Sequence, residues 1–174
     1  MRKFYILFLL VQAFIFTANA QFEGELVIMV IGSEAGNDAE VALEERMTGM
    51  GLDVMVFDDD AISDAEAGGA DLLLISGTVN SGTSFQNMPG LASYSIPIIN
   101  NEPGLHDELG FSAEGGTGID EPEGKLEIIN FDHPLAAELG GTIAVTDIGK
   151  RFCGGVPGGD VNIIANSVTA DSLA

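Results

Sequence analysis

The chain alternates short apolar runs with segments whose hydrophobic residues recur at helical spacing. Leu26–Ile31 (LVIMVI) is continuously apolar, as is typical of a strand buried on both faces of a parallel sheet. Leu52–Phe57, Leu72–Ile75 and Ile96–Asn100 are further apolar runs of strand length. Short helices between these runs predict right-handed β-α-β units. We therefore expect an α/β fold, a flavodoxin-like three-layer sandwich with a mostly parallel central sheet and strand order 2-1-3-4.

Two capping boxes mark the starts of the first two expected helices. Asn37 precedes Glu40 by three residues, and Ser63 precedes Glu66 by three residues. In such a box each side chain accepts a hydrogen bond from the backbone of the other residue. Gly51 follows the last residue of the first helical pattern and is expected to end that helix.

The alternation of strand and helix becomes weaker after the third strand. Ser76–Ser84 is rich in Gly, Ser and Thr and is expected to be a loop. A helix is expected from Leu105–Leu109, followed by a polar loop at Gly110–Gly124. The later pattern predicts strands at Lys125–Asn130, Thr142–Thr146 and Val161–Ala165, and a helix at Pro134–Leu139 capped by Asp132 or His133.

The first twenty residues have the features of a secretory signal peptide. Arg2 and Lys3 precede the apolar run Phe4–Phe16, and Ala18–Ala20 is an A-x-A cleavage site. A run of about 13 residues is too short to span a bilayer, so no stable membrane insertion is expected. The prediction is a secreted, periplasmic or cell-surface protein cleaved near Ala20. Residues 21–174 then form one domain, which we expect to be truncated at its C-terminus.

Acidic residues dominate the charge of the chain. Asp and Glu number 27 against 6 Lys and Arg, which gives a net charge of −21. Loss of Arg2 and Lys3 with the leader would change this to −23 (−21 − 2). Such a surface repels nucleic acid and anionic lipid, so neither is expected as a partner. Cys153 is the only cysteine, which excludes an intramolecular disulfide.

Four segments carry a resemblance to a known fold family. They are Ala70–Gly77 (ADLLLISG), Ile96–Ile99 (IPII), Glu102–Pro103 and Asp132–Leu135 (DHPL). In their order along residues 25–170, the chain resembles the class I glutamine amidotransferase-like fold. It is most similar to the non-catalytic, trehalose-utilisation-like branch, as in modules of large secreted bacterial proteins. The resemblance implies that other domains belong to a longer parent chain.

The resemblance also implies where a ligand would bind. The loop at Ser76, Gly77 and Thr78 corresponds to the loop that supplies oxyanion donors in the amidotransferases. The position of their nucleophilic cysteine corresponds to Glu102, beside Asn101. A carboxylate cannot form the thioester intermediate, so no glutamine amidotransferase activity is expected. These five residues are the predicted ligand-binding set, and the Ser76 loop is expected to border the Glu102 turn.

Three residues are candidates for catalysis, namely Glu102, His106 and His133. A Glu–His pair could act as acid and base or hold a metal ion. A structural interpretation also stays open: Glu102 could accept backbone bonds at a helix start, His133 could cap a helix, and His106 could lie on a solvated helix face.

Two loops raise the question of a bound ion or cofactor. Asp58, Asp59 and Asp60 could ligate calcium, although their spacing does not fit an EF-hand, and a solvated acidic turn is the alternative. Glu34 and Asp38, after the first strand, would repel a phosphate, so no nucleotide or flavin cofactor is expected.

Two functional hypotheses follow from these observations. The first is an exported, non-catalytic ligand-binding or accessory module whose ligand is an extracellular small molecule or glycan. The second is a hydrolase-like enzyme acting on such a molecule through Glu102 with His106 or His133.

Overall fold

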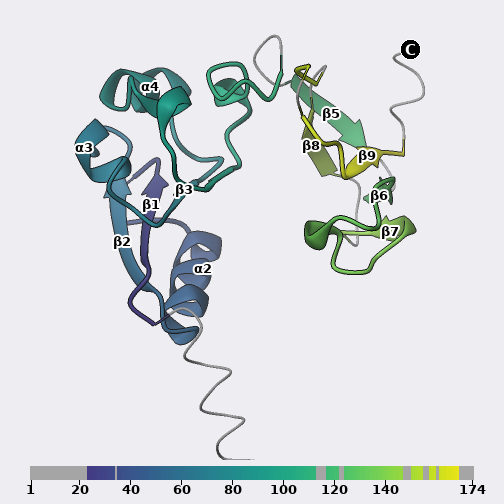
Figure 1. Cartoon of the computed structure of the whole chain (residues 1–174), viewed down its shortest axis with the longest axis horizontal. Coiled ribbons are helices and arrows are strands. Elements are labelled where there is room, and N and C mark those ends of the chain that lie inside the picture. Colours follow the sequence, from purple (N-terminus) through teal and green to yellow (C-terminus); the bar gives the residue numbers. More distant parts are fainter. Residues whose placement is uncertain are drawn as a thin grey trace, which may run out of the picture. The chain divides into compact units, whose positions relative to one another are not determined.

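The computed structural model describes residues 23–33, 35–112, 117–121, 124–146, 150–154, 157–159 and 161–168. The chain divides into two compact units, Met1–Glu102 and Pro103–Ala174, which are visible in Figure 1. The expected signal peptide and Glu34 lie outside the described residues. Within the described ranges, no helix has the length and apolar character needed to cross a membrane.

The first unit contains a four-stranded parallel sheet. Its strands are β1 (Leu26–Ile31), β2 (Asp53–Asp58), β3 (Leu72–Ile75) and β4 (Ile98–Asn100). They lie in the order β2-β1-β3-β4, and all three pairings are parallel. The predicted strand order and the α/β, flavodoxin-like class are therefore confirmed. In this order the chain moves from one side of β1 to the other between β2 and β3, which places the topological switch point between β1 and β3.

Both faces of the central strand are buried. Helix α2 (Asp38–Gly49) lies along one face, where Leu43 and Met47 pack in a cluster with Val27, Met29 and other apolar strand residues. The alternate residues of β1, Ile28 and Val30, point to the opposite face and are at most 2% exposed. Burial on both faces explains why the sequence of β1 is continuously apolar.

The local signals for helix starts are confirmed. Asn37 caps α2 and Ser63 caps α3 (Asp64–Ala67), each within a complete capping box. Helix α4 (Ser81–Asn87) occupies part of the segment expected to be a loop. Its Asn80 side chain accepts a hydrogen bond from the Thr83 N–H, 3.1 Å away. A short 3-10 helix, η1 (Leu91–Ser93), then leads towards β4.

The second unit contains antiparallel strands. A pair is formed by β5 (Thr117–Glu121) and β8 (Lys150–Gly154), and a three-stranded sheet has the order β7-β6-β9. The strands of that sheet are β6 (Lys125–Ile128), β7 (Gly141–Ala144) and β9 (Ala165–Ser167). Strands β6 and β7 overlap the expected strands Lys125–Asn130 and Thr142–Thr146, and β9 begins at the last residue of the expected strand Val161–Ala165. Strands β5 and β8 have no counterpart among the expected strands.

The two helices expected in this unit are shorter than the sequence suggested. The 3-10 helix η2 (Pro103–Leu105) overlaps the expected helix Leu105–Leu109 only at Leu105. Turns follow as far as Gly110, where φ is +71°. The expected helix at Pro134–Leu139 is the 3-10 helix η3 (Pro134–Ala136). A left-handed Ala137, with φ +50° and ψ +41°, ends it after a single turn.

Candidate functional site

The carboxyl end of β3 runs into a loop whose two hydroxyl groups face a buried carboxylate. The Ser76 hydroxyl and the Thr78 hydroxyl each donate a hydrogen bond of 2.5 Å to Oε1 of Glu40. Ser76 is 8% exposed and Glu40 is also 8% exposed. The cluster of Glu40, Ser76 and Thr78 therefore lies at the switch point between β1 and β3, where open α/β sheets bind ligands.

The other carboxylate oxygen of Glu40 is held by the first turn of α2. Its Oε2 accepts a hydrogen bond of 2.7 Å from the Asn37 backbone N–H, which completes the capping box. The same side chain thus caps its own helix and joins that helix to the loop after β3. The sequence predicted the first of these roles from the three-residue spacing. In the second role Glu40 bonds to Ser76 and Thr78, which lie 36 and 38 residues further along the chain. No local sequence signal predicts contacts over that separation.

These contacts keep Glu40 ionised. Burial raises the pKa of the Glu40 carboxyl, but hydrogen bonds from Ser76, Thr78 and the Asn37 backbone together outweigh burial. The net effect lowers the pKa of Glu40 below its ordinary value of 4.5. A lowered pKa makes the Glu40 carboxylate a weaker general base towards the Ser76 hydroxyl.

The loop after β1 is packed tightly against the loop after β3. The Gly32 N–H donates to the Thr78 hydroxyl at 3.1 Å. A Cβ atom at Gly32 would lie 2.0 Å from the Thr78 carbonyl oxygen, so only glycine fits there. Direct packing between the two loops leaves no room for a phosphate between Gly32 and Thr78.

The turn after β4 lies next to the Ser76 loop, as expected for the ends of two neighbouring parallel strands. A Cβ atom at Gly77 would lie 3.0 Å from the Asn101 carbonyl oxygen, and the Asn101 N–H donates to the Ile75 carbonyl at 2.9 Å. The Asn100 side chain both donates to the Glu102 carbonyl and accepts from its N–H, at 2.8 and 3.0 Å. The Glu102 side chain is half-buried. That it faces a ligand remains a prediction.

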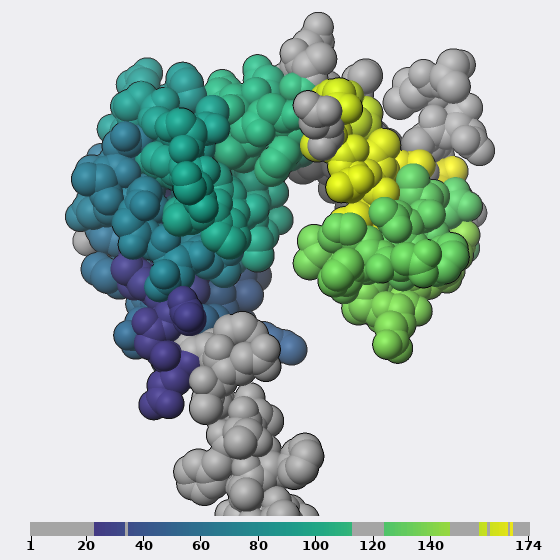
Figure 2. All heavy atoms as spheres, in the orientation of Figure 1, coloured from purple at the N-terminus to yellow at the C-terminus, as the bar shows by residue number. Residues whose placement is uncertain are grey.

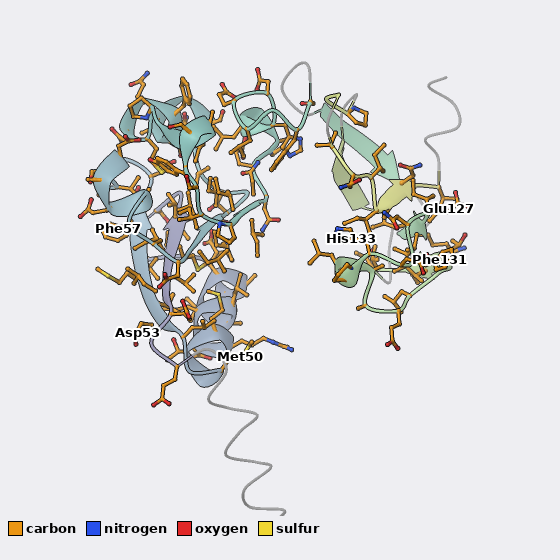
Figure 3. All side chains as sticks on the ribbon, viewed as in Figure 1. Met50, Asp53, Phe57, Glu127, Phe131 and His133 are labelled. Atoms are coloured by element: carbon orange, nitrogen blue, oxygen red, sulfur yellow. The ribbon has the colours of Figure 1, made fainter. Side chains whose placement is uncertain are left out.

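The two histidines belong to the second unit. His133 caps η3, because its Nδ1 accepts a hydrogen bond from the Leu135 N–H at 3.2 Å. The His106 ring lies edge-on to Phe111, with ring centroids 6.2 Å apart. Glu102 lies in the first unit, so its pairing with either histidine stays a prediction. Figure 3 labels His133 and Phe131, which both lie in the second unit.

Beside His106, two adjacent acids share a hydrogen bond. A hydrogen bond from Glu108 lowers the pKa of the Asp107 carboxyl, and the positive charge of His106 adds a smaller lowering. The same bond, followed by burial, raises the pKa of Glu108. The Asp107 carboxyl is therefore expected to lose its proton before the Glu108 carboxyl does.

The acidic turn after β2 is engaged with the backbone. Asp59 is 6% exposed, and its carboxylate accepts a hydrogen bond from the Asn80 N–H at the start of α4. Asp58 accepts from the Asp60 N–H at 3.4 Å, while Asp60 itself is exposed. Within the ranges that the structure describes, no three His, Cys, Asp or Glu side chains are grouped to hold a metal ion.

A small pocket adjoins Glu40 on the α2 face of the sheet. Its volume is about 260 Å³. Its lining combines apolar side chains of β1, β2 and α2 with two carboxylates: Met29, Ile31, Ala35, Gly36, Glu40, Val41, Glu44 and Val56. The sequence did not single out this pocket, because its lining comes from three elements and has no motif of its own.

Comparison with known proteins leaves the family resemblance without direct support. No protein-family model and no curated protein matches the chain.

Proposed function

We propose that the chain is an exported, non-catalytic ligand-binding or accessory module of a secreted or cell-surface protein. The hydrogen bonds at the switch point carry this proposal. The hydroxyl groups of Ser76 and Thr78 could stabilise an oxyanion only if they pointed at a substrate. Both hydroxyls instead donate to Glu40 at 2.5 Å. A third hydrogen bond, from the Asn37 backbone, holds the carboxylate in place.

The charge at this position also supports a binding role over hydrolysis. An ionised Glu40 beside the loop would repel the negative charge that develops on a carbonyl oxygen during acyl transfer. The low pKa of Glu40 means that this repulsion persists at neutral pH. The resemblance to the non-catalytic, trehalose-utilisation-like branch agrees with this interpretation, and the ligand we propose is an extracellular small molecule or glycan.

Hydrolysis through Glu102 is the alternative function. We would test it with chromogenic ester, amide and glycoside substrates and with ammonia release from glutamine. The purified chain should show no turnover above buffer. A rate that is lost in Glu102→Gln but kept in Glu45→Gln, which removes an exposed carboxylate from α2, would establish the alternative and end the binding-only proposal.

Export is tested separately from binding. The chain is expressed with its own N-terminus and a C-terminal tag, and the exported product is analysed by mass spectrometry. Under the proposal, its N-terminal residue is Gln21. A product that keeps Met1 and stays inside the cell would contradict export, whatever the outcome of the turnover assays.

A further inference from the structure

A second pocket lies at the other end of the parallel sheet, where the strands begin. Its volume is about 540 Å³, within the range of roughly 300–1,000 Å³ that is usual for small-molecule sites. Figure 3 shows Met50 at the end of α2, close to Asp53 at the start of β2, while Phe57 lies at the opposite end of that strand. The lining residues are Glu25, Val27, Met47, Met50, Leu52, Asp71, Leu72 and Pro97.

The walls of this pocket are apolar and adaptable. Val27 and Met47 belong to the buried cluster between the sheet and α2, and Leu52 and Leu72 pack against that cluster. Met50 is 43% exposed, so an apolar side chain already faces solvent at the mouth. Methionine side chains are flexible and polarizable, and they can adjust to apolar ligands of different shape.

The rim of the pocket is negatively charged. Among the described residues that line it, Glu25 and Asp71 are the charged ones, and both are exposed. The Asp71 carboxylate is held in place because its Oδ2 accepts a hydrogen bond of 2.8 Å from the Leu26 N–H. Figure 2 shows the segment before β1, coloured purple, at the surface of the first unit. Apolar walls with two carboxylates at the mouth complement a ligand that has an apolar body and a positive end.

We propose that this amino-terminal pocket binds a small cationic amphiphile. Its apolar body would contact Met50, Leu52 and Leu72, and its ammonium group would lie between Glu25 and Asp71. The site is distinct from the carboxyl-end loops, so it stands or falls independently of the proposed function at Glu40 and Glu102.

Methionine methyl resonances provide a site-specific test. The chain contains six methionines, of which Met47 and Met50 line the pocket, whereas Met29, Met55 and Met88 do not. The full-length protein is labelled at its methionine methyl groups and titrated with octyltrimethylammonium. Octanoate has a similar apolar body with the opposite charge, and tetramethylammonium has the charge without the apolar body. We expect octyltrimethylammonium to shift the Met47 and Met50 resonances in a saturable way, and we expect neither octanoate nor tetramethylammonium to do so.

Matched variants separate the rim from the overall acidity. Glu25→Gln with Asp71→Asn removes both rim charges, and the asparagine keeps an oxygen for the Leu26 N–H. We expect this pair to weaken binding about fivefold or more, as loss of two partly exposed charge contacts implies. Glu45→Gln with Asp60→Asn removes the same charge at exposed positions outside the pocket and should leave the affinity unchanged.

Three results would overturn the proposal. One is that octanoate shifts the Met47 and Met50 resonances as much as octyltrimethylammonium does. Another is that the two pairs of variants weaken the affinity for octyltrimethylammonium equally. The third is a shift of the Met47 and Met50 resonances in the Phe22→Ala variant but not in the wild type. That result would show that the chain's own N-terminal segment fills the pocket.

Discussion

Replacement of Glu40 should destabilise the first unit by a predictable amount. Glu40→Ala removes the acceptor of three hydrogen bonds, from Ser76, Thr78 and the Asn37 backbone. Hydrogen bonds to a charged group contribute about 1.5–3 kcal/mol each, but they are not additive within one cluster. The Ser76 and Thr78 hydroxyls lie 3.2 Å apart and can partly satisfy each other. We therefore expect a loss of about 3 kcal/mol for Glu40→Ala.

Glu40→Gln is the more informative variant because it keeps the shape of the side chain. Its amide oxygen can still accept from the two hydroxyls, but its NH2 group then faces the Asn37 N–H, which is also a donor. We expect a loss of about 1–2 kcal/mol at pH 7. Because the pKa of Glu40 is lower in the folded state, its stabilising effect is complete above the unfolded pKa of about 4.5. That effect disappears as the pH falls through the folded pKa.

Urea unfolding followed by tyrosine fluorescence measures both effects. The assay uses residues 21–174, in which there is no Trp and Tyr94 is the only Tyr, so the signal reports on the first unit, which contains Glu40. With a urea m-value of about 2 kcal/mol/M, a loss of 3 kcal/mol lowers the midpoint by about 1.5 M. The difference between wild type and Glu40→Gln should shrink between pH 7 and pH 3.5. A midpoint unchanged from that of Glu45→Gln, or a difference independent of pH, would refute the role assigned to Glu40.

Three further predictions concern other parts of the molecule. Gly32→Ala should strongly destabilise the fold or prevent folding, because the added Cβ would lie 2.0 Å from the Thr78 carbonyl oxygen. Soluble yield and circular dichroism would check this, with Gly49→Ala as the control because no atom lies within 4 Å of a Cβ at Gly49. The melting temperature should rise from low salt to about 1 M NaCl, where the Debye length is roughly 3 Å, because 27 acidic residues repel one another; a flat curve would contradict this. Burial, followed by a hydrogen bond of 2.5 Å to Asp64, raises the pKa of the Tyr94 phenol well above 10, so its stabilising effect is full below pH 10 and falls as the pH rises further. Absorbance titration of residues 21–174, in which Tyr94 is the only Tyr, should show no phenolate at pH 10.5 while the protein is folded, with Tyr94→Phe as control.

The parallel sheet could be predicted because its signals are local. Leu26–Ile31 and Leu72–Ile75 have the predicted bounds, since each is a short apolar run flanked by polar or glycine residues. The capping boxes at Asn37 and Ser63 were also readable, because a three-residue spacing defines them.

Elements that depend on distant partners could not be predicted in this way. Strands β5 and β8 pair Gly118 with Cys153, and neither TGIDE nor KRFCG has a clear alternation of apolar and polar residues. Helix α4 has little apolar periodicity in SGTSFQN, although Asn80 at its start is a cap signal that could have been recognised. In the site, the expected neighbourhood of Gly77 and Asn101 followed from parallel strand ends. The hydrogen bond between Ser76 and Glu40 could not be predicted, because it depends on how α2 packs on the sheet.

The position of β1 in the middle of its sheet has a consequence for biogenesis. This strand is made before both of its neighbours, yet it must pair with β2 on one edge and with β3 on the other. Until Asp53–Asp58 and Leu72–Ile75 have been synthesised, six uncharged apolar residues carry two open edges, a combination that favours aggregation between chains. The acidic residues of the neighbouring segments would then keep nascent molecules apart by mutual repulsion. A weakly charged version of the same sheet would depend more heavily on chaperones, even if its final fold were equally stable.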